Sequence, residues 1–259
     1  MESKTVAFPC LAFSLSLAAC LSGVQPVPVD KPGPVEVPLQ QPLPVPGFPT
    51  VDWSATQPPG ATGTCANPYI PVLEGATWTS AVSFGPVSMT QVDTITDVGT
   101  DAFLVETKAG DTSVLVTWTC TPGGVLWLQS NGGMFSAVSQ DLTWSTSSFS
   151  GVTIPAALQP GDTWSSSQEM VATGAGGSQS FTINIDYRAV GAESVTVPAG
   201  TFDAMRIDFV MRFAGPDTES AFEFSDWFVK DLGLVMSTAQ QTTGGSLDFR
   251  QELLDYSIP

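Results

Sequence analysis

The sequence contains no histidine, only 8 lysine and arginine residues, and a charged fraction of only 13%. The missing imidazole excludes Ser-His-Asp and Cys-His catalysis, together with zinc sites that depend on histidine. The 25 acidic residues give a net charge of −17, whereas binding of nucleic acid needs clustered basic side chains. The same charge favours a soluble monomer. We therefore expect no enzyme, no cofactor, no metal site and no nucleic-acid partner.

Residues 1–19 have the features of a signal peptide. Lys4 supplies a minimal positive charge, and the mostly apolar stretch from Thr5 to Ala19 is too short to span a bilayer. It ends in Leu17-Ala18-Ala19-Cys20, which resembles the bacterial lipobox, whose cysteine receives a diacylglyceryl group and becomes the first mature residue. We therefore predict Cys20 as a lipidation site and the membrane as a partner. The alternative is an ordinary signal peptide with a chance cysteine.

Lipidation would account for the number of cysteines. Cys10 would leave with the signal peptide and Cys20 would be acylated, so that Cys65 and Cys120 remain. An even pair in an oxidising compartment predicts a disulfide, which would close a loop of about 55 residues. Two buried free thiols are the alternative. No Cys-x-x-Cys motif occurs, so a redox or zinc role for the pair is not expected.

Residues 20–61 are predicted to be an acylated cysteine followed by a proline-rich tether. Nine of the 21 prolines lie between Pro26 and Pro49, alternating with valine and leucine. Such a sequence favours polyproline II and behaves as a semi-rigid spacer. We interpret it as a stalk that holds a domain away from the membrane. A docking ligand of the Pro-x-x-Pro type is the alternative.

Residues 62–259 are predicted to form a single all-β domain. The hydrophobic fraction of 42% is sufficient for a core, and apolar and polar residues alternate along two segments. An alternation with a period of two residues indicates a strand with one buried face and one solvent-exposed face. We predict a curved antiparallel sheet, either a half-barrel or a sandwich, with short helical turns at most at 136–142 or 252–256. The apolar positions are Phe181, Ile183, Ile185 and Tyr187, then Met205, Ile207, Phe209, Met211 and Phe213.

A faint internal duplication suggests two related β-meanders, at 66–150 and 151–259. Each half contains a proline, a glycine turn and then a Thr-Trp pair, at Thr77-Trp78 and at Thr163-Trp164. No linker composition separates the halves, so we expect one sheet system rather than two domains. Chance similarity in a chain rich in Thr, Ser and Trp is the alternative.

Three segments in order carry a family resemblance: Gly-Asp-Thr-Trp at 161–164, Val-Thr-Val-Pro-Ala-Gly-Thr-Phe-Asp-Ala at 195–204, and Trp-Phe-Val-Lys-Asp-Leu-Gly-Leu-Val at 227–235. Together they resemble a group of uncharacterised bacterial envelope lipoproteins. That group is similar to the curved half-barrels of lipoprotein-localisation factors, although the helices that cover those sheets have no counterpart here. The resemblance covers about residues 66–259 and implies a fold but no catalytic residues.

The tryptophans are the remaining candidates for a binding role. We propose Trp127, Trp118 and Trp227 as a candidate ligand face, because a concave aromatic sheet suits an acyl chain, a sugar or a peptide. The expected function is that of a lipid-anchored, non-catalytic envelope protein that binds a hydrophobic or polymeric ligand. The alternative is a structural module that docks another envelope protein. We expect an extracytoplasmic location, at the outer membrane or cell surface, because Leu21 is not the aspartate of inner-membrane retention.

Overall fold

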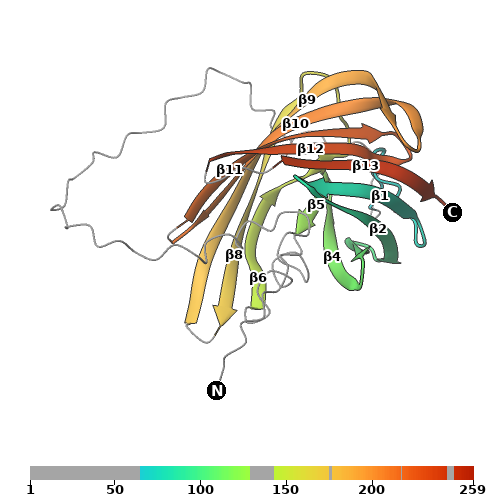
Figure 1. Ribbon diagram of the computed structural model, residues 1–259. Coiled ribbons are helices and arrows are strands. Elements are labelled where there is room, and N and C mark those ends of the chain that lie inside the picture. The colour runs from blue at the N-terminus through green and yellow to red at the C-terminus, as the bar shows by residue number, and fades with distance from the viewer. Residues whose placement is uncertain (1–64, 129–142, 175–176, 217, 244–247) are drawn as a thin grey trace.

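In the computed structural model, residues 65–128, 143–174, 177–216, 218–243 and 248–259 are described, and they form one antiparallel sheet of 13 strands (Figure 1). Within these ranges no helix is long and apolar enough to cross a membrane. The strands are β1 (Thr77–Phe84), β2 (Val87–Val98), β3 (Ala102–Ala109), β4 (Thr112–Thr121), β5 (Gly124–Leu128), β6 (Thr143–Gly151), β7 (Ile154–Pro155), β8 (Thr163–Gly174), β9 (Gly177–Val197), β10 (Gly200–Gly215), β11 (Thr218–Val229), β12 (Gly233–Thr243) and β13 (Asp248–Ser257).

The sheet is built from two meanders joined through the first and last strands. Its order is β6-β8-β9-β10-β11-β12-β13-β1-β2-β3-β4-β5-β7. The predicted all-β fold with a curved antiparallel sheet is therefore confirmed. The two meanders do not divide at 150/151 as expected. β6, which ends at Gly151, pairs with β8 of the second meander, whereas the later strand β7 pairs with β5 of the first.

The two edge strands of the sheet, β6 and β7, follow one another in the sequence, with only Val152 and Thr153 between them. This short connection brings the two edges of the sheet together. No ladder joins these edges among the described strands, so the sheet stays open, but hydrogen bonds bridge the seam. Gln168 Nε2 on β8 donates to the backbone oxygen of Trp127 on β5 at 2.7 Å. The Trp127 backbone N–H donates to Thr153 Oγ1 at 3.0 Å. The sheet thus curls almost into a barrel, as Figure 1 shows.

Glycine is required at two points beside this seam. A Cβ on Gly124 would lie 2.2 Å from the Ile154 carbonyl oxygen, and one on Gly151 would lie 2.1 Å from that of Ser165. Both glycines also have positive φ, at 146° and 76°, a conformation that other residues rarely adopt. The first residue of β5 and the last residue of β6 therefore need to be glycine, because the neighbouring backbone approaches closely.

The strands follow the alternation in the sequence. Along β9, Ile183, Ile185, Tyr187 and Ala189 are buried, while each residue between them is exposed. The segment 195–204 that carries part of the family resemblance forms a hairpin, with β9 ending at Val197 and β10 starting at Gly200. The segment 252–256, which we expected as a helical turn, lies instead within β13, where its pairing with β1 holds it extended. The other expected turn, at 136–142, lies outside the described residues.

The predicted disulfide joins Cys65 to Cys120, with 5.1 Å between the Cα atoms. It ties the segment before β1 to β4. The same segment is fixed by Asn67, whose side-chain amide donates to the carbonyl oxygens of Ile154 and Pro155 at 3.1 and 3.2 Å. The start of the described chain is thus fastened across β4 and β7. The predicted signal peptide, Cys20 and the tether lie outside the described residues.

The apolar side chains form two clusters on opposite faces of the sheet. The larger one fills the concave face and includes Phe103, Ile183 and Phe222, each nearly inaccessible to solvent. The smaller one includes Val195, Val197, Trp227 and Met236. We call these the inner and the outer cluster. The inner cluster surrounds the feature described next.

Candidate functional site

The inner face of the sheet lines a partly open cavity of about 260 Å³. Most of its wall is apolar and aromatic, and it draws side chains from both meanders. The volume lies near the lower end of the range of small-molecule sites, roughly 300–1,000 Å³. The wall includes Trp78, Phe84, Ile95, Phe103, Val105, Val116, Trp118, Trp127, Ile154, Ile185, Tyr187, Ile207, Phe209, Met211, Phe224, Asp226, Phe228, Leu234 and Phe249.

Trp118 and Trp127 lie next to each other on this wall. They are directly paired across β4 and β5, and their rings stack with 6.0 Å between the centroids. Phe103 on β3 stacks on the other side of Trp118, at 5.7 Å. The indole N–H of Trp127 is buried and has no hydrogen-bond partner. These two predicted residues therefore share one aromatic surface inside the cavity.

Trp227 does not share that surface, so the predicted set of three tryptophans does not come together. It lies between Asp226 and Phe228 on β11, and both of those residues line the cavity. Because neighbouring side chains on a strand point to opposite faces, Trp227 points outward, where it is buried in the outer cluster. Its indole N–H donates to Glu193 Oε1.

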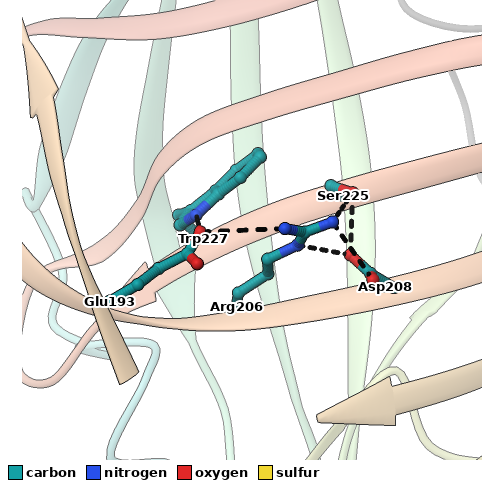
Figure 2. Close-up of polar contacts among 5 residues, drawn as sticks. All are labelled: Glu193, Arg206, Asp208, Ser225 and Trp227. Atoms are coloured by element: carbon teal, nitrogen blue, oxygen red, sulfur yellow. Dashed lines mark hydrogen bonds and ion pairs between the residues drawn. The ribbon is translucent and has the colours of Figure 1, made fainter. Parts of the chain in front are cut away.

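A polar network surrounds Trp227 on the outer face (Figure 2). The guanidinium of Arg206 lies 5.4 Å from the centroid of the Trp227 ring. It also forms an ion pair with Asp208, at 2.7 Å, and Ser225 Oγ donates to the same Asp208 oxygen at 2.7 Å. The arginine and aspartate side chains are about one-third exposed, so the ion pair contributes little to stability. We interpret this network as a stabilising cover over the tryptophan rather than as a binding site.

Two carboxyl groups lie in the cavity wall, and Asp93 on β2 is the better satisfied one. Its oxygens accept hydrogen bonds from Thr107 Oγ1 at 2.5 Å and from Gln91 Nε2 at 2.9 Å. Burial raises the pKa of Asp93, and these two hydrogen bonds oppose the rise. Asp93 is thus a half-buried acid, and each of its two oxygens already accepts a hydrogen bond from the protein.

Asp226 on β11 is the second carboxyl group, and it is less well satisfied. Its side chain lines the cavity, and its Oδ1 is buried without a hydrogen-bond partner. Burial raises the pKa of Asp226 to about 7, with a hydrogen bond to Ser237 opposing the rise and the charge of Asp208 adding to it. Asp226 is thus an acid in the cavity wall with one oxygen that accepts no hydrogen bond from the protein.

Tyr187 on β9 completes the polar part of the wall. Its hydroxyl lies 3.2 Å from Ser166 Oγ. Burial raises the pKa of Tyr187, and the negative charge of Asp226 contributes to the rise. The phenol therefore stays neutral at all ordinary pH values. It can donate or accept a hydrogen bond, but it does not supply a charge.

The wall can pack against an apolar molecule and form a few hydrogen bonds with it. No group of three or more His, Cys, Asp or Glu side chains that could hold a metal ion occurs in the part of the chain that the structure describes. Sequence reasoning missed Asp226, Asp93 and Tyr187 as site residues. For Asp226 a signal existed, because it falls on the same period-two face as Phe222, Phe224 and Phe228.

The fold and its hollow define a class: an open, strongly curved antiparallel sheet with an apolar interior. The model of a family described as DUF3108-like matches residues 130–246. No curated protein matches the chain.

Two solved structures share the fold. One is a candidate exported protein with a YmcC-like fold from Bacteroides fragilis NCTC 9343, at 14% identity and a TM-score of 0.51, with 74% of this chain and 100% of that chain covered. The other is a candidate lipoprotein from Parabacteroides distasonis ATCC 8503, at 15% identity and a TM-score of 0.52, with 74% and 99% covered. At such identities the likeness establishes the fold alone.

Proposed function

We propose that this chain is a lipid-anchored envelope protein whose curved sheet holds an apolar ligand in its cavity and catalyses no reaction. The observation that carries the proposal is the cavity of about 260 Å³, lined mostly by apolar and aromatic side chains. A hollow of this kind with a few polar groups is the usual form of a small-molecule site.

The alternative, a structural module that docks another envelope protein, has less support. Docking by an apolar surface needs a contiguous exposed patch. The large exposed hydrophobic side chains of the described ranges are scattered instead. They include Val87 and Val98 on β2, Leu115 on β4, Phe149 on β6 and Tyr256 on β13.

Ligand binding is tested with a hydrophobic fluorescent dye and the folded chain. We expect saturable binding that Trp127→Ala weakens by about tenfold, because this substitution removes the central aromatic surface of the cavity. Leu115→Ala is the matched control, since Leu115 is exposed and lies between the cavity-lining residues Val114 and Val116, so that its side chain points to the outside of the sheet. Equal loss in both variants, or no saturable binding by the wild type, would refute the proposed cavity ligand.

The membrane anchor is supported by the lipobox at Leu17–Cys20, and the candidate lipoprotein from Parabacteroides distasonis is consistent with it. We expect Cys20→Ala to move the protein from the membrane fraction to the soluble fraction, because two or three acyl chains anchor a protein stably and their loss leaves no anchor. Detergent phase partitioning of both forms measures this. Cys10→Ala is the control and should change nothing. Unchanged partitioning of the Cys20→Ala variant would exclude lipidation at Cys20.

A further inference from the structure

The charges around the cavity are all of one sign. The ionisable side chains in its wall are Asp93, Asp226 and Tyr187. None of the basic residues in the described ranges contributes to the wall: Lys108, Arg188, Arg206, Arg212, Lys230 and Arg250. An anionic head group entering this cavity would therefore meet two carboxyl groups and no cation, so its charge would remain unpaired.

The two carboxyl groups differ in what they still need. Asp93 already accepts hydrogen bonds from Thr107 and Gln91, whereas Asp226 Oδ1 has no partner and is buried. Buried polar atoms are nearly always hydrogen-bonded, so an exception needs a reason. Asp226 is an acceptor that faces the cavity and can receive a hydrogen bond from a molecule inside it.

A second unpartnered atom lies on another strand of the same wall. The indole N–H of Trp127 on β5 is buried without an acceptor. A hydroxyl or amide group on the ligand could satisfy it. One uncharged N–H does not replace the cation that a carboxylate or phosphate head group needs.

The cavity volume limits the size of the occupant. About 260 Å³ lies near the lower end of the range for small-molecule sites. Such a volume suits one chain or one ring system rather than a lipid with several acyl chains.

We propose that the cavity selects a slender apolar molecule whose head group donates hydrogen bonds and carries no negative charge, with Asp226 as the acceptor for that head group. An uncharged alcohol or a cationic amine meets this description, and a fatty acid does not. The inference rests on the proposed function, since it assumes that the cavity takes an apolar ligand. It adds that the head group of the ligand carries no negative charge, and that Asp226 accepts its hydrogen bond.

The test compares three probes with one chain length: n-decylamine, n-decanol and decanoate. The protein is the full chain with Cys20→Ala, made in an oxidising compartment, so that no detergent is needed. Binding is measured by calorimetry at about pH 8.5, where an alkylamine remains protonated because its pKa is near that of lysine, about 10.4. Salt at about 0.15 M screens charges on the outside of the sheet.

We expect decylamine and decanol to bind at least tenfold more tightly than decanoate. Asp226→Asn should weaken decylamine binding by about tenfold and leave decanol binding within about twofold, because the amide keeps an acceptor oxygen but loses the charge. Glu223→Gln is the matched control. It makes the same change in net charge on the same strand, but at an exposed position on the opposite face.

The outcomes separate the two proposals. If decanoate binds as tightly as decylamine, or if Asp226→Asn and Glu223→Gln have equal effects on decylamine, the inference about the head group is wrong while the apolar ligand site stands. If none of the three probes binds, the ligand site itself fails, and the inference fails with it. The comparison of probes on the wild-type cavity needs no Asp226 variant, so misfolding of Asp226→Asn would not remove the test.

Discussion

Replacing Cys65 and Cys120 with serine should lower the free energy of unfolding by about 4 kcal/mol. The disulfide between them closes a sequence separation of 55 residues, and a loop of that length loses about 4 kcal/mol of entropic stabilisation when it is opened. For a domain of this size each kcal/mol corresponds to roughly 2–4 °C in Tm, so the melting temperature should fall by roughly 8–16 °C.

The position of the disulfide adds a structural reason for a large effect. Cys65 begins the segment whose Asn67 side chain is bound to β7, the strand next to the seam. The same segment carries Ile70 into the cavity wall. Losing the disulfide should loosen the part of the wall where the two edges of the sheet meet.

Urea unfolding of the oxidised wild type, the reduced wild type and the double serine variant measures this effect. Reduction should destabilise the wild type by the same amount and leave the variant unchanged, which distinguishes loss of the cross-link from damage by the new side chains. A loss below about 1 kcal/mol would mean that the segment before β1 opens locally and that the disulfide does not support the sheet as a whole.

The strands could be predicted from the sequence, but the curling of the sheet that brings its two edges together could not. Alternation along 181–188 placed every buried side chain of that segment, because one strand needs only local information. Curvature is a property of many strands together, and it depends on bulges such as the one at Arg206 and Ile207. Nothing local in Ile154–Pro155 shows that this short strand pairs with β5 on the far edge.

The error at Trp227 has a different origin. We expected Trp227 on one ligand face together with Trp118 and Trp127. The alternation of Phe222, Phe224 and Phe228 on its own strand instead places Trp227 outward and Asp226 inward, as the structure has them. Strict application of period two would therefore have found both the outward tryptophan and the inward carboxyl group.

An acid that faces an apolar hollow should also make the stability of the chain depend on pH. The pKa of Asp226 is about 7 in the folded state, against 3.8 for an ordinary aspartate. Between these values the folded chain holds a proton that the unfolded chain has released. Folding is therefore most favoured by this group below about pH 4, and the benefit is lost as the pH rises through about 7.

Asp226→Asn should consequently stabilise the chain at pH 8.5 by on the order of 2–4 kcal/mol and have almost no effect at pH 4, because the amide is neutral at both. Other acids near the site are Asp208 on β10, Tyr187 on β9 and Asp93 across the cavity on β2. These three residues are present in both the variant and the wild type, so the comparison isolates the change at position 226. Glu223→Gln should stay within about 0.5 kcal/mol at both pH values, since it is exposed.

Urea unfolding at the two pH values measures this difference, and decylamine links it to the ligand site. If the amine binds at Asp226, saturating decylamine should remove most of the advantage of Asp226→Asn at pH 8.5, because the wild type then has a partner for its buried charge and the variant does not. An advantage of similar size at pH 4 and pH 8.5 would show that the substitution acts through packing. In that case the carboxylate would not be the group that the cavity leaves unsatisfied.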